Sequence, residues 1–461
     1  MQYVSTRGQS ARRDFRGVLL AGLAEDGGLF MPETWPALDL NALRGLPYPA
    51  LAARVIHPFL DPWLSLGRLQ AVCEDAYASF SHPAIVPLTQ LGPDLWAQEL
   101  FHGPTLAFKD VAMQLLGRLF DAALGSAGQR VTIVGATSGD TGSAAIEACR
   151  DRASLNVVIL HPAGRTSEVQ RRQMTTVLAP NIGNLAVNGT FDDCQDLVKA
   201  MFADAPFRDE VQLAAVNSIN WARIAAQIPY YVSASLALAA AGSVDFAIPT
   251  GNFGNVFAAW AARRMGAPIG RLVIATNRND ILARFLAEND MSARAVEPSL
   301  SPSMDIQVSS NFERLLFELL DRDPGRTAQI MLAFRAEGRM PVPNEAWRRA
   351  TADVAGFALD DGGTTAEMRR LFAQSYLADP HTAIAVAAAR AHARRGTPMI
   401  AAATAHPAKF PGAVQAATGH LPPLPLHLAD LYEREERFTP VPAGLDQVEA
   451  QVRAFTRRNA A

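Results

Sequence analysis

Short apolar runs alternate along the chain with longer segments of helical spacing. Six runs rich in Val, Ile, Leu and Ala predict β-strands, at residues 131–135, 156–162, 212–217, 245–249, 271–277 and 399–407. Ala-rich stretches of helical spacing separate them. Strands that are apolar along their length and separated by helices are typical of a parallel sheet covered on both faces. The pattern therefore predicts an α/β fold.

The first 95 residues follow a different pattern. Apolar positions at helical spacing predict helices in 50–60 and 68–80, and prolines interrupt the segment repeatedly. We therefore expect an N-terminal helical region over 1–95. A first α/β lobe is expected over 96–230, and a second lobe with C-terminal helices over 231–461.

Composition and charge narrow the function. The 461 residues include 42 Lys and Arg against 45 Asp and Glu, and this near balance provides no basic surface for nucleic acid. No apolar stretch approaches the ~20 residues that span a bilayer, so we expect no membrane segment. Cys73, Cys149 and Cys194 follow no metal-binding spacing. They predict reduced thiols in a cytoplasmic protein without a metal site.

Only three of the basic residues are lysines. Lys199 is expected on the solvated face of a helix, and Lys409 at the rim of a site because it follows the last strand. Lys109 lies beside Leu106 and Phe108, and an apolar neighbourhood lowers the pKa of a lysine, which makes the neutral amine available for imine formation. The alternative is a lysine that extends to the surface from the start of a helix.

Two of the predicted strands end in glycine-rich turns that open into helices. The turns are GATSGDTG from Gly135 and TGNFGN from Thr250, and this geometry presents backbone N–H groups to an anion. Neither turn matches GxxxxGK[ST] or a complete GxGxxG unit, which disfavours ATP and NAD. One such turn can simply connect a strand to a helix. An imine-forming lysine together with a phosphate-binding turn is what pyridoxal phosphate requires. The polar segment EPSLSPSMD at 297–305 is expected at a lobe boundary or in an active-site loop.

At these residues the chain resembles the threonine synthases, a family of fold type II pyridoxal-phosphate enzymes. The resemblance covers most of the chain and rests on these segments: YVSTRG at 3–8, EDGGLFMP at 25–32, HGPTLAFKD at 102–110, GATSGDTG at 135–142, NSIN at 217–220, GNFGN at 251–255, ATNRNDIL at 275–282, DPHTA at 379–383 and TAHPAKF at 404–410. It implies a tryptophan synthase β-like fold with two parallel-sheet lobes, and pyridoxal 5'-phosphate as cofactor.

The resemblance also implies roles for individual residues. Lys109 is the implied catalytic lysine that binds the cofactor covalently, with Phe108 beside it. The implied cofactor-phosphate site consists of Gly251, Asn252, Phe253, Gly254 and Asn255, the partner of the ring nitrogen is Thr404, and the substrate carboxylate is received by Thr137, Ser138, Gly139, Asp140 and Thr141. A hydroxyl at the ring nitrogen cannot keep it protonated as a carboxylate would, so the ring becomes a weaker electron sink.

The implied reaction converts O-phospho-L-homoserine and water into L-threonine and phosphate, by β,γ-elimination and addition of water at the β carbon. Lys109 is the expected proton carrier. Candidate ligands of the substrate phosphate, chosen by nearness to strand ends, are Arg165, Asn217, Ser218, Asn220, Arg223 and Lys409. Histidines in the matching segments are expected to be scaffold residues rather than proton donors; they are His102, His381 and His406.

Two alternatives stay open at this point. A phospho-lyase or dehydratase that releases a 2-oxo acid would share the fold and the cofactor, because fold alone does not decide the reaction. A non-catalytic binding protein would be expected to lack the lysine, which this chain retains at position 109. The family resemblance favours a monomer.

Overall fold

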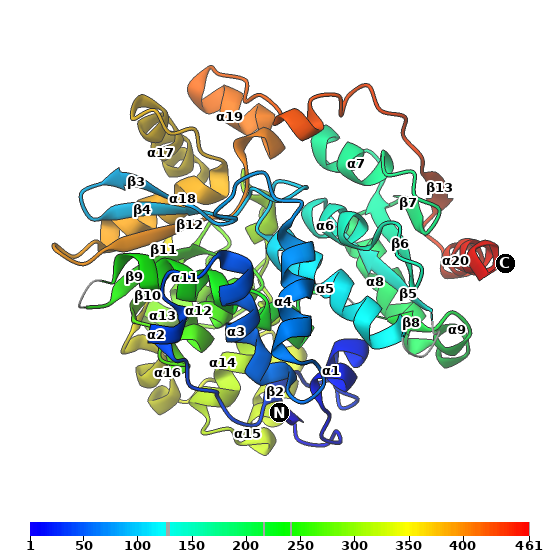
Figure 1. Ribbon diagram of the computed structural model, residues 1–461, viewed down its shortest axis with the longest axis horizontal. Helices are drawn as coiled ribbons and strands as arrows, with labels where there is room; N and C mark the ends of the chain where they lie inside the picture. The colour runs from blue at the N-terminus through cyan, green and yellow to red at the C-terminus, as the bar shows by residue number, and fades with distance from the viewer. Residues whose placement is uncertain (126–129, 215–216, 240–241, 461) are drawn as a thin grey trace.

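The computed structural model describes residues 1–125, 130–214, 217–239 and 242–460, which form two lobes that each contain one main sheet (Figure 1). The larger sheet has the order β11-β10-β9-β12-β4-β3. Its strands are β3 (Leu88–Gly92), β4 (Leu95–Glu99), β9 (Val244–Pro249), β10 (Ile269–Thr276), β11 (Val354–Ala358) and β12 (Met399–Ala403). The smaller sheet has the order β13-β7-β6-β5-β8. Its strands are β5 (Val131–Ala136), β6 (Leu155–Pro162), β7 (Ile182–Asn188), β8 (Leu213–Ala214) and β13 (Thr439–Pro442).

Both sheets are parallel apart from the β3–β4 hairpin. β6 and β9 are buried along their whole length. Continuous burial explains why these strands appear in the sequence as mostly apolar runs rather than as alternating patterns. The expectation of an α/β fold with parallel sheets is confirmed.

Four of the six predicted strands coincide with β5, β6, β9 and β10. The last predicted strand is too long, because β12 ends at Ala403. Pro407 starts a short 3-10 helix, η3 (Pro407–Lys409), whose cap is the His406 side chain, which accepts a hydrogen bond from the backbone N–H of Ala408. The prediction at 212–217 overlaps β8 only at Leu213–Ala214, and 215–216 lie outside the described residues.

The N-terminal region contains four helices before residue 78. It contains α1 (Phe15–Ala21), α2 (Leu40–Leu43), α3 (Tyr48–Leu60) and α4 (Leu66–Tyr77), and the last two confirm the helices predicted in 50–60 and 68–80. The Asp14 and Ser65 side chains cap α1 and α4 by accepting hydrogen bonds from backbone N–H groups. Strands β1 (Tyr3–Ser5) and β2 (Phe30–Pro32) form a separate antiparallel pair.

The lobes do not follow the contiguous ranges that we expected. β3 and β4 join the larger sheet, although 1–95 was expected to be helical and 96–230 to belong to the first lobe. The C-terminal segment returns to the smaller sheet, where β13 pairs with β7 and α20 (Leu445–Ala460) covers it (Figure 1). Val448 and Val452 of α20 pack into the apolar cluster of that sheet, so burial of these side chains holds the tail there rather than in the second lobe.

The remaining helices cover the two sheets. They are α5 (Lys109–Leu124), α6 (Asp140–Cys149), α7 (Glu168–Thr175), α8 (Phe191–Ala203), α9 (Ala205–Glu210), α10 (Trp221–Ala225), α11 (Ile228–Leu238), α12 (Gly254–Arg264), α13 (Ile281–Glu288), α14 (Phe312–Leu319), α15 (Pro324–Glu337), α16 (Asn344–Thr351), α17 (Asp361–Ala373), α18 (Pro380–His392) and α19 (Pro411–Thr418), with 3-10 turns η2 (Pro302–Met304) and η4 (Leu426–Leu428). In the described part of the chain, every helix is too short or too polar to cross a lipid bilayer.

Candidate active site

One cavity lies where the carboxyl ends of β5, β9 and β12 face one another. Ligand sites of parallel sheets form outside these ends, because the loops that follow the strands converge there. The cavity is lined by these sequence-predicted residues from both lobes: Phe108, Lys109, Asp140, Thr141, Gly251, Asn252, Phe253, Gly254, Asn255 and Thr404. The fold therefore brings together segments that are far apart in the sequence.

Lys109 is positioned by the segment that follows β12. The backbone N–H of Phe108 donates to the carbonyl of Thr404 at 2.9 Å, and the N–H of His406 donates to the carbonyl of Leu106 at 3.0 Å. These bonds fix the start of α5 beside Thr404. The side chain of Lys109 is only 12% exposed, and burial lowers its pKa, although the nearby Asp140 carboxylate opposes this shift. A lowered pKa makes the neutral amine more available for imine formation.

Asp140 accepts hydrogen bonds and ion pairs on both carboxylate oxygens. Oδ2 lies 3.0 Å from Lys109 Nζ and 3.3 Å from Ser303 Oγ, and Oδ1 lies 2.9 Å from both Lys409 Nζ and Gln170 Nε2. Burial alone would raise the pKa of Asp140, but the two lysines hold it well below its usual range. A charged carboxylate repels an anion, so a contact of Asp140 with the substrate carboxylate would involve its backbone N–H rather than its side chain.

The structure places the other two lysines very differently. Lys409 was expected at the rim of a site but is completely buried, because it spans from η3 to Asp140 through the interior. Lys199 has a side chain that is 71% exposed and pairs with Asp196 on the surface of α8. The expectation for Lys199 is therefore confirmed, and that for Lys409 is wrong.

The turn after β5 is stabilised by its own side chains. Thr137 Oγ1 accepts hydrogen bonds from the backbone N–H groups of Gly139 and Gly142, both at 2.9 Å. Gly139 has φ +147°, and a Cβ there would lie 2.5 Å from Gln170, so only glycine fits. Ser138 is exposed and Thr141 lines the cavity. Thr137 is one of the five residues expected to bind the substrate carboxylate, and in this structure its hydroxyl oxygen stabilises the turn.

The second glycine-rich turn has the shape of an anion-binding site. Phe253 adopts the left-handed conformation, with φ 65°, immediately before α12. The carbonyls of Gly251 and Asn252 accept hydrogen bonds from Ser309 Oγ at 2.7 Å and from the backbone N–H of Asn311 at 3.0 Å. Left-handed residues at the start of a helix turn successive N–H groups toward one point, where a phosphate is favoured.

Asn255 provides an independent test of whether a phosphate fits. Its Oδ1 accepts hydrogen bonds from the hydroxyls of Tyr230 and Tyr231, the latter at 2.7 Å. Its Nδ2 is buried and finds no hydrogen-bond partner within the described residues. A buried donor without a partner costs free energy unless a ligand satisfies it. The unpaired Nδ2 of Asn255, beside this turn, therefore fits a bound anion such as the cofactor phosphate.

Gly251 is expected to be essential for this turn because of a close approach. A Cβ on Gly251 would lie 2.8 Å from the carbonyl oxygen of Ser303. We expect Gly251→Ala to introduce about 1–3 kcal/mol of strain and to raise the dissociation constant for pyridoxal phosphate about tenfold. Equilibrium titration with the cofactor measures this change. Gly412→Ala is the matched control, since a Cβ there meets nothing within 4 Å, and equal affinity of the two variants would contradict the expectation.

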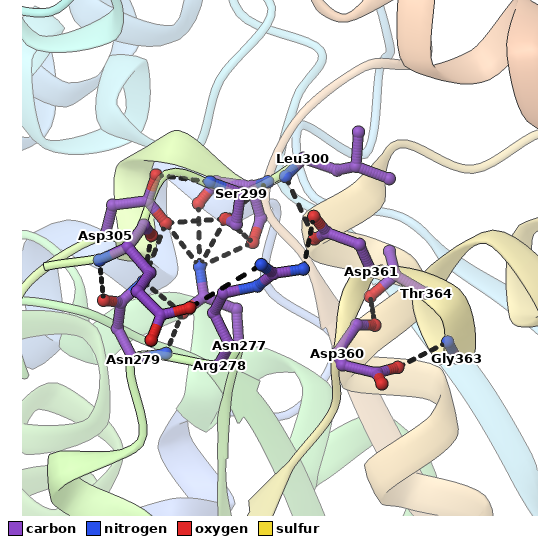
Figure 2. Close-up of polar contacts among 12 residues, drawn as sticks. Asn277, Arg278, Asn279, Ser299, Leu300, Asp305, Asp360, Asp361, Gly363 and Thr364 are labelled. Carbon is purple, nitrogen blue, oxygen red and sulfur yellow. Dashed lines mark hydrogen bonds and ion pairs between the residues drawn. The ribbon is translucent and has the colours of Figure 1, made fainter.

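Ser303 is carried by the segment 297–305, which a polar network holds in place (Figure 2). Asn277 Nδ2, at the end of β10, donates to Ser301 Oγ at 3.0 Å and to Asp305 Oδ1 at 2.7 Å. Asn279 Nδ2 donates to the same carboxylate oxygen at 3.1 Å. The expectation of an active-site loop at 297–305 agrees with this arrangement, because Ser303 and Met304 line the cavity.

Two of the six candidates for the substrate phosphate line the cavity, namely Ser218 and Arg223. Arg223 is buried, and burial lowers its pKa to about 10, so it keeps its charge at neutral pH. Arg165 and Asn217 are exposed, and neither lines the cavity. Asn220 caps α10, and Lys409 is fully engaged with protein acceptors.

His381 also lines the cavity, although the sequence indicated a scaffold role. Its Nδ1 lies 2.7 Å from Asp379 Oδ2, and its Nε2 is buried without a partner among the described residues. Gln227 lines the cavity too, and no pattern in the sequence marked it. Among the described residues, no group of three or more His, Cys, Asp or Glu could hold a metal ion.

Comparison with known proteins defines the class to which this fold and cavity belong. A family model described as pyridoxal-phosphate dependent enzyme matches residues 83–336, which confirms the predicted cofactor. Two further models, threonine synthase N terminus and threonine synthase C-terminal, match residues 2–77 and 382–452. The chain belongs to the threonine synthase family.

Individual relatives are similar to this chain over almost its whole length. Threonine synthase from Pseudomonas aeruginosa is 52% identical over 98% of both chains. The crystal structure of pyridoxal-phosphate-bound threonine synthase from Brucella melitensis has a TM-score of 0.97 at 47% identity and covers 99% of this chain and 100% of that chain. Threonine synthase from Escherichia coli has a TM-score of 0.83 at 30% identity and covers 98% and 99%. The predicted resemblance and fold type II class are confirmed.

Proposed function

We propose that this protein converts O-phospho-L-homoserine and water into L-threonine and phosphate. The observation that carries the proposal is a buried lysine of lowered pKa, Lys109, which shares one cavity with an anion-binding turn in a chain of the threonine synthase family. When bound, pyridoxal phosphate supplies the electron sink that makes the carbons next to its imine acidic.

Lys109 is the proposed proton carrier. Its amine lies at the start of α5 and faces the cavity, where burial favours the neutral form. A neutral amine in a dry site can take a proton from one carbon of the substrate and return it to another. Asp140 Oδ2 accepts a hydrogen bond from the Lys109 amine, and the Ser303 hydroxyl donates to the same oxygen and so helps to hold the carboxylate in place.

The binding roles divide between the two turns. The residues Gly251 to Asn255 are proposed to bind the cofactor phosphate, and Thr404 to meet the ring nitrogen. Backbone N–H groups of the turn that precedes α6 are proposed to receive the substrate carboxylate, while the Asp140 side chain serves Lys109 instead. Arg223 and Ser218 are proposed for the substrate phosphate, because a guanidinium and a hydroxyl match its charge and its acceptor oxygens.

The assay that tests the function uses the protein loaded with pyridoxal phosphate. It measures threonine, 2-oxobutyrate and phosphate together after incubation with O-phospho-L-homoserine. We expect threonine and phosphate in equal amounts. Phosphate with the oxo acid instead would replace the proposal with a phospho-lyase, and no turnover would favour a binding protein.

A cytoplasmic location and a monomeric state are further parts of the proposal. The three cysteines are buried and free, and burial raises the pKa of Cys73 and Cys149 to about 12, which suits unreactive thiols in a reducing compartment. Sedimentation measurements test the oligomeric state.

A further inference from the structure

The ammonium group of Lys409 lies inside the protein and contacts protein oxygens there. Nζ lies 2.7 Å from the carbonyl oxygen of Thr105, 3.0 Å from Gln173 Oε1 and 2.9 Å from Asp140 Oδ1. An ammonium has three N–H donors, and three protein oxygens surround this one, two as hydrogen-bond acceptors and that of Asp140 as an ion-pair partner. Lys409 therefore does not offer a hydrogen bond to a substrate in this arrangement, and its contact with Asp140 needs another explanation.

Asp140 connects Lys409 to the reacting lysine. Lys109 binds Oδ2 and Lys409 binds Oδ1, so one carboxylate lies between two ammonium groups. The Asp140 side chain is 6% exposed and that of Lys409 is 0% exposed. Charges that are so well removed from water interact strongly, and an unbalanced charge there is costly.

The surrounding groups leave one positive charge in excess. Besides Asp140 and Lys409, the charged groups near Lys109 among the described residues are Arg223 and, next to it on the same helix, Asp110. The Asp110 carboxylate accepts hydrogen bonds from Thr105, and burial raises its pKa to about 6. The imidazole of His381 lines the same cavity. Above the pKa of Asp110 both carboxylates are ionised, and with Lys109 protonated three cations among these groups face two anions. The charges balance once Lys109 has lost its proton.

We propose that Lys409 is a positioning residue that prepares Lys109 for attachment to the cofactor, an inference that rests on the proposed function. In this step the ammonium of Lys109 releases a proton to solvent. The neutral amine then attacks the aldehyde carbon, a C=N bond replaces the C=O bond, and water leaves without any oxidation or reduction. Lys409 remains as counter-ion of Asp140, so the carboxylate keeps a partner when Lys109 becomes neutral.

The test measures how fast protein freed of cofactor attaches to pyridoxal phosphate at different pH values, with borohydride trapping at Lys109 as the readout. Without the charge of Lys409, Asp140 depends on Lys109 alone and keeps it protonated. We expect Lys409→Met to move the midpoint of the rate profile up by about one pH unit or more. Lys409→Arg, which retains a cation, is expected to restore the parental midpoint.

Asp140→Asn is expected to shift the midpoint of the rate profile in the opposite direction. Without the carboxylate, Lys109 faces Lys409 and Arg223 with less compensating charge, so its midpoint is expected to move down. Lys199→Met, at an exposed lysine, is the matched control and is expected to leave the midpoint unchanged. If Lys409→Met folds too poorly to measure, the double variant Asp140→Asn, Lys409→Met removes both partners, and its midpoint is expected above that of Asp140→Asn alone.

The outcomes separate this inference from the proposed function, because no substrate is present. Equal midpoints for Lys409→Met and Lys199→Met, or shifts of the same sign for Lys409→Met and Asp140→Asn, would overturn the role of Lys409. A midpoint of the double variant equal to that of Asp140→Asn would also overturn the role of Lys409. A parent protein that attaches no cofactor at any pH would instead refute the proposed function.

Discussion

Lys109→Ala is expected to abolish covalent attachment of the cofactor and to lower threonine formation by at least about a thousandfold. The variant loses the only amine among the cavity-lining residues of the described chain, because Lys199 lies on the surface and Lys409 is engaged elsewhere. Asp140 keeps Lys409 as a partner, so the fold is expected to tolerate the change. Product analysis and borohydride trapping followed by peptide mapping measure the two effects.

Lys199→Ala is the control, since its side chain is 71% exposed and pairs only with a neighbouring surface carboxylate on α8. It is expected to retain both the label and the activity. A trapped cofactor on Lys199 or Lys409 in the parent protein, or a Lys109→Ala variant with parental activity, would show that the reacting amine is a different one.

Asp140→Ala is expected to lower the free energy of unfolding by about 3–5 kcal/mol at neutral pH, because it leaves two ammonium groups near each other without their shared carboxylate. Removing one partner from a buried ion pair costs far more than removing an exposed pair. Asp196→Ala is the matched control, since Asp196 pairs with Lys199 in the open and is expected to change stability by less than about 1 kcal/mol. Denaturant unfolding with both variants measures the difference.

The lowered pKa of Asp140 also predicts how the stability of the protein depends on pH. Lys109 and Lys409 hold the pKa of Asp140 well below its usual range although burial acts in the opposite direction, and an unfolded aspartate titrates near about pH 3.9. A lowered pKa in the folded state stabilises the fold above that value, and the stabilisation is lost as the pH falls toward the folded pKa. The stability gap between parent and Asp140→Ala should therefore narrow below about pH 4. A gap that stays constant as the pH falls through this range would contradict the ion-pair explanation.

Much of the site could be predicted because its parts follow strand ends. The turn at 251–255 follows β9 and Thr404 follows β12, and these neighbouring parallel strands of the larger sheet end at the same edge. The turn at 135–142 follows β5 in the same way, at the carboxyl edge of the smaller sheet. The burial of Lys409 could not be predicted in this way. Its contact with Asp140 joins the segment after β12 to the start of α6, and no local spacing determines which way a long side chain extends.

Strands were missed for a related reason. β7 includes Gly183 and Asn184, which interrupt its apolar pattern, and β11 includes Gly356. Such strands are stable only through neighbours distant in sequence, as when β7 pairs with both β6 and β13. The side-chain amide of Asn184 donates a hydrogen bond from Nδ2 to the carbonyl of Met174 at 3.0 Å, and only the folded chain provides this acceptor.

The return of the C-terminal segment to the smaller sheet affects how the protein is made. β7 is synthesised long before β13, its partner at the sheet edge, and α20, which packs beside it, is the last element of the described chain to leave the ribosome. Until then one edge of β7 lacks a partner strand, and an unpaired edge can join to another chain. Truncation near residue 438 is therefore expected to leave that edge of β7 unpaired and to promote aggregation.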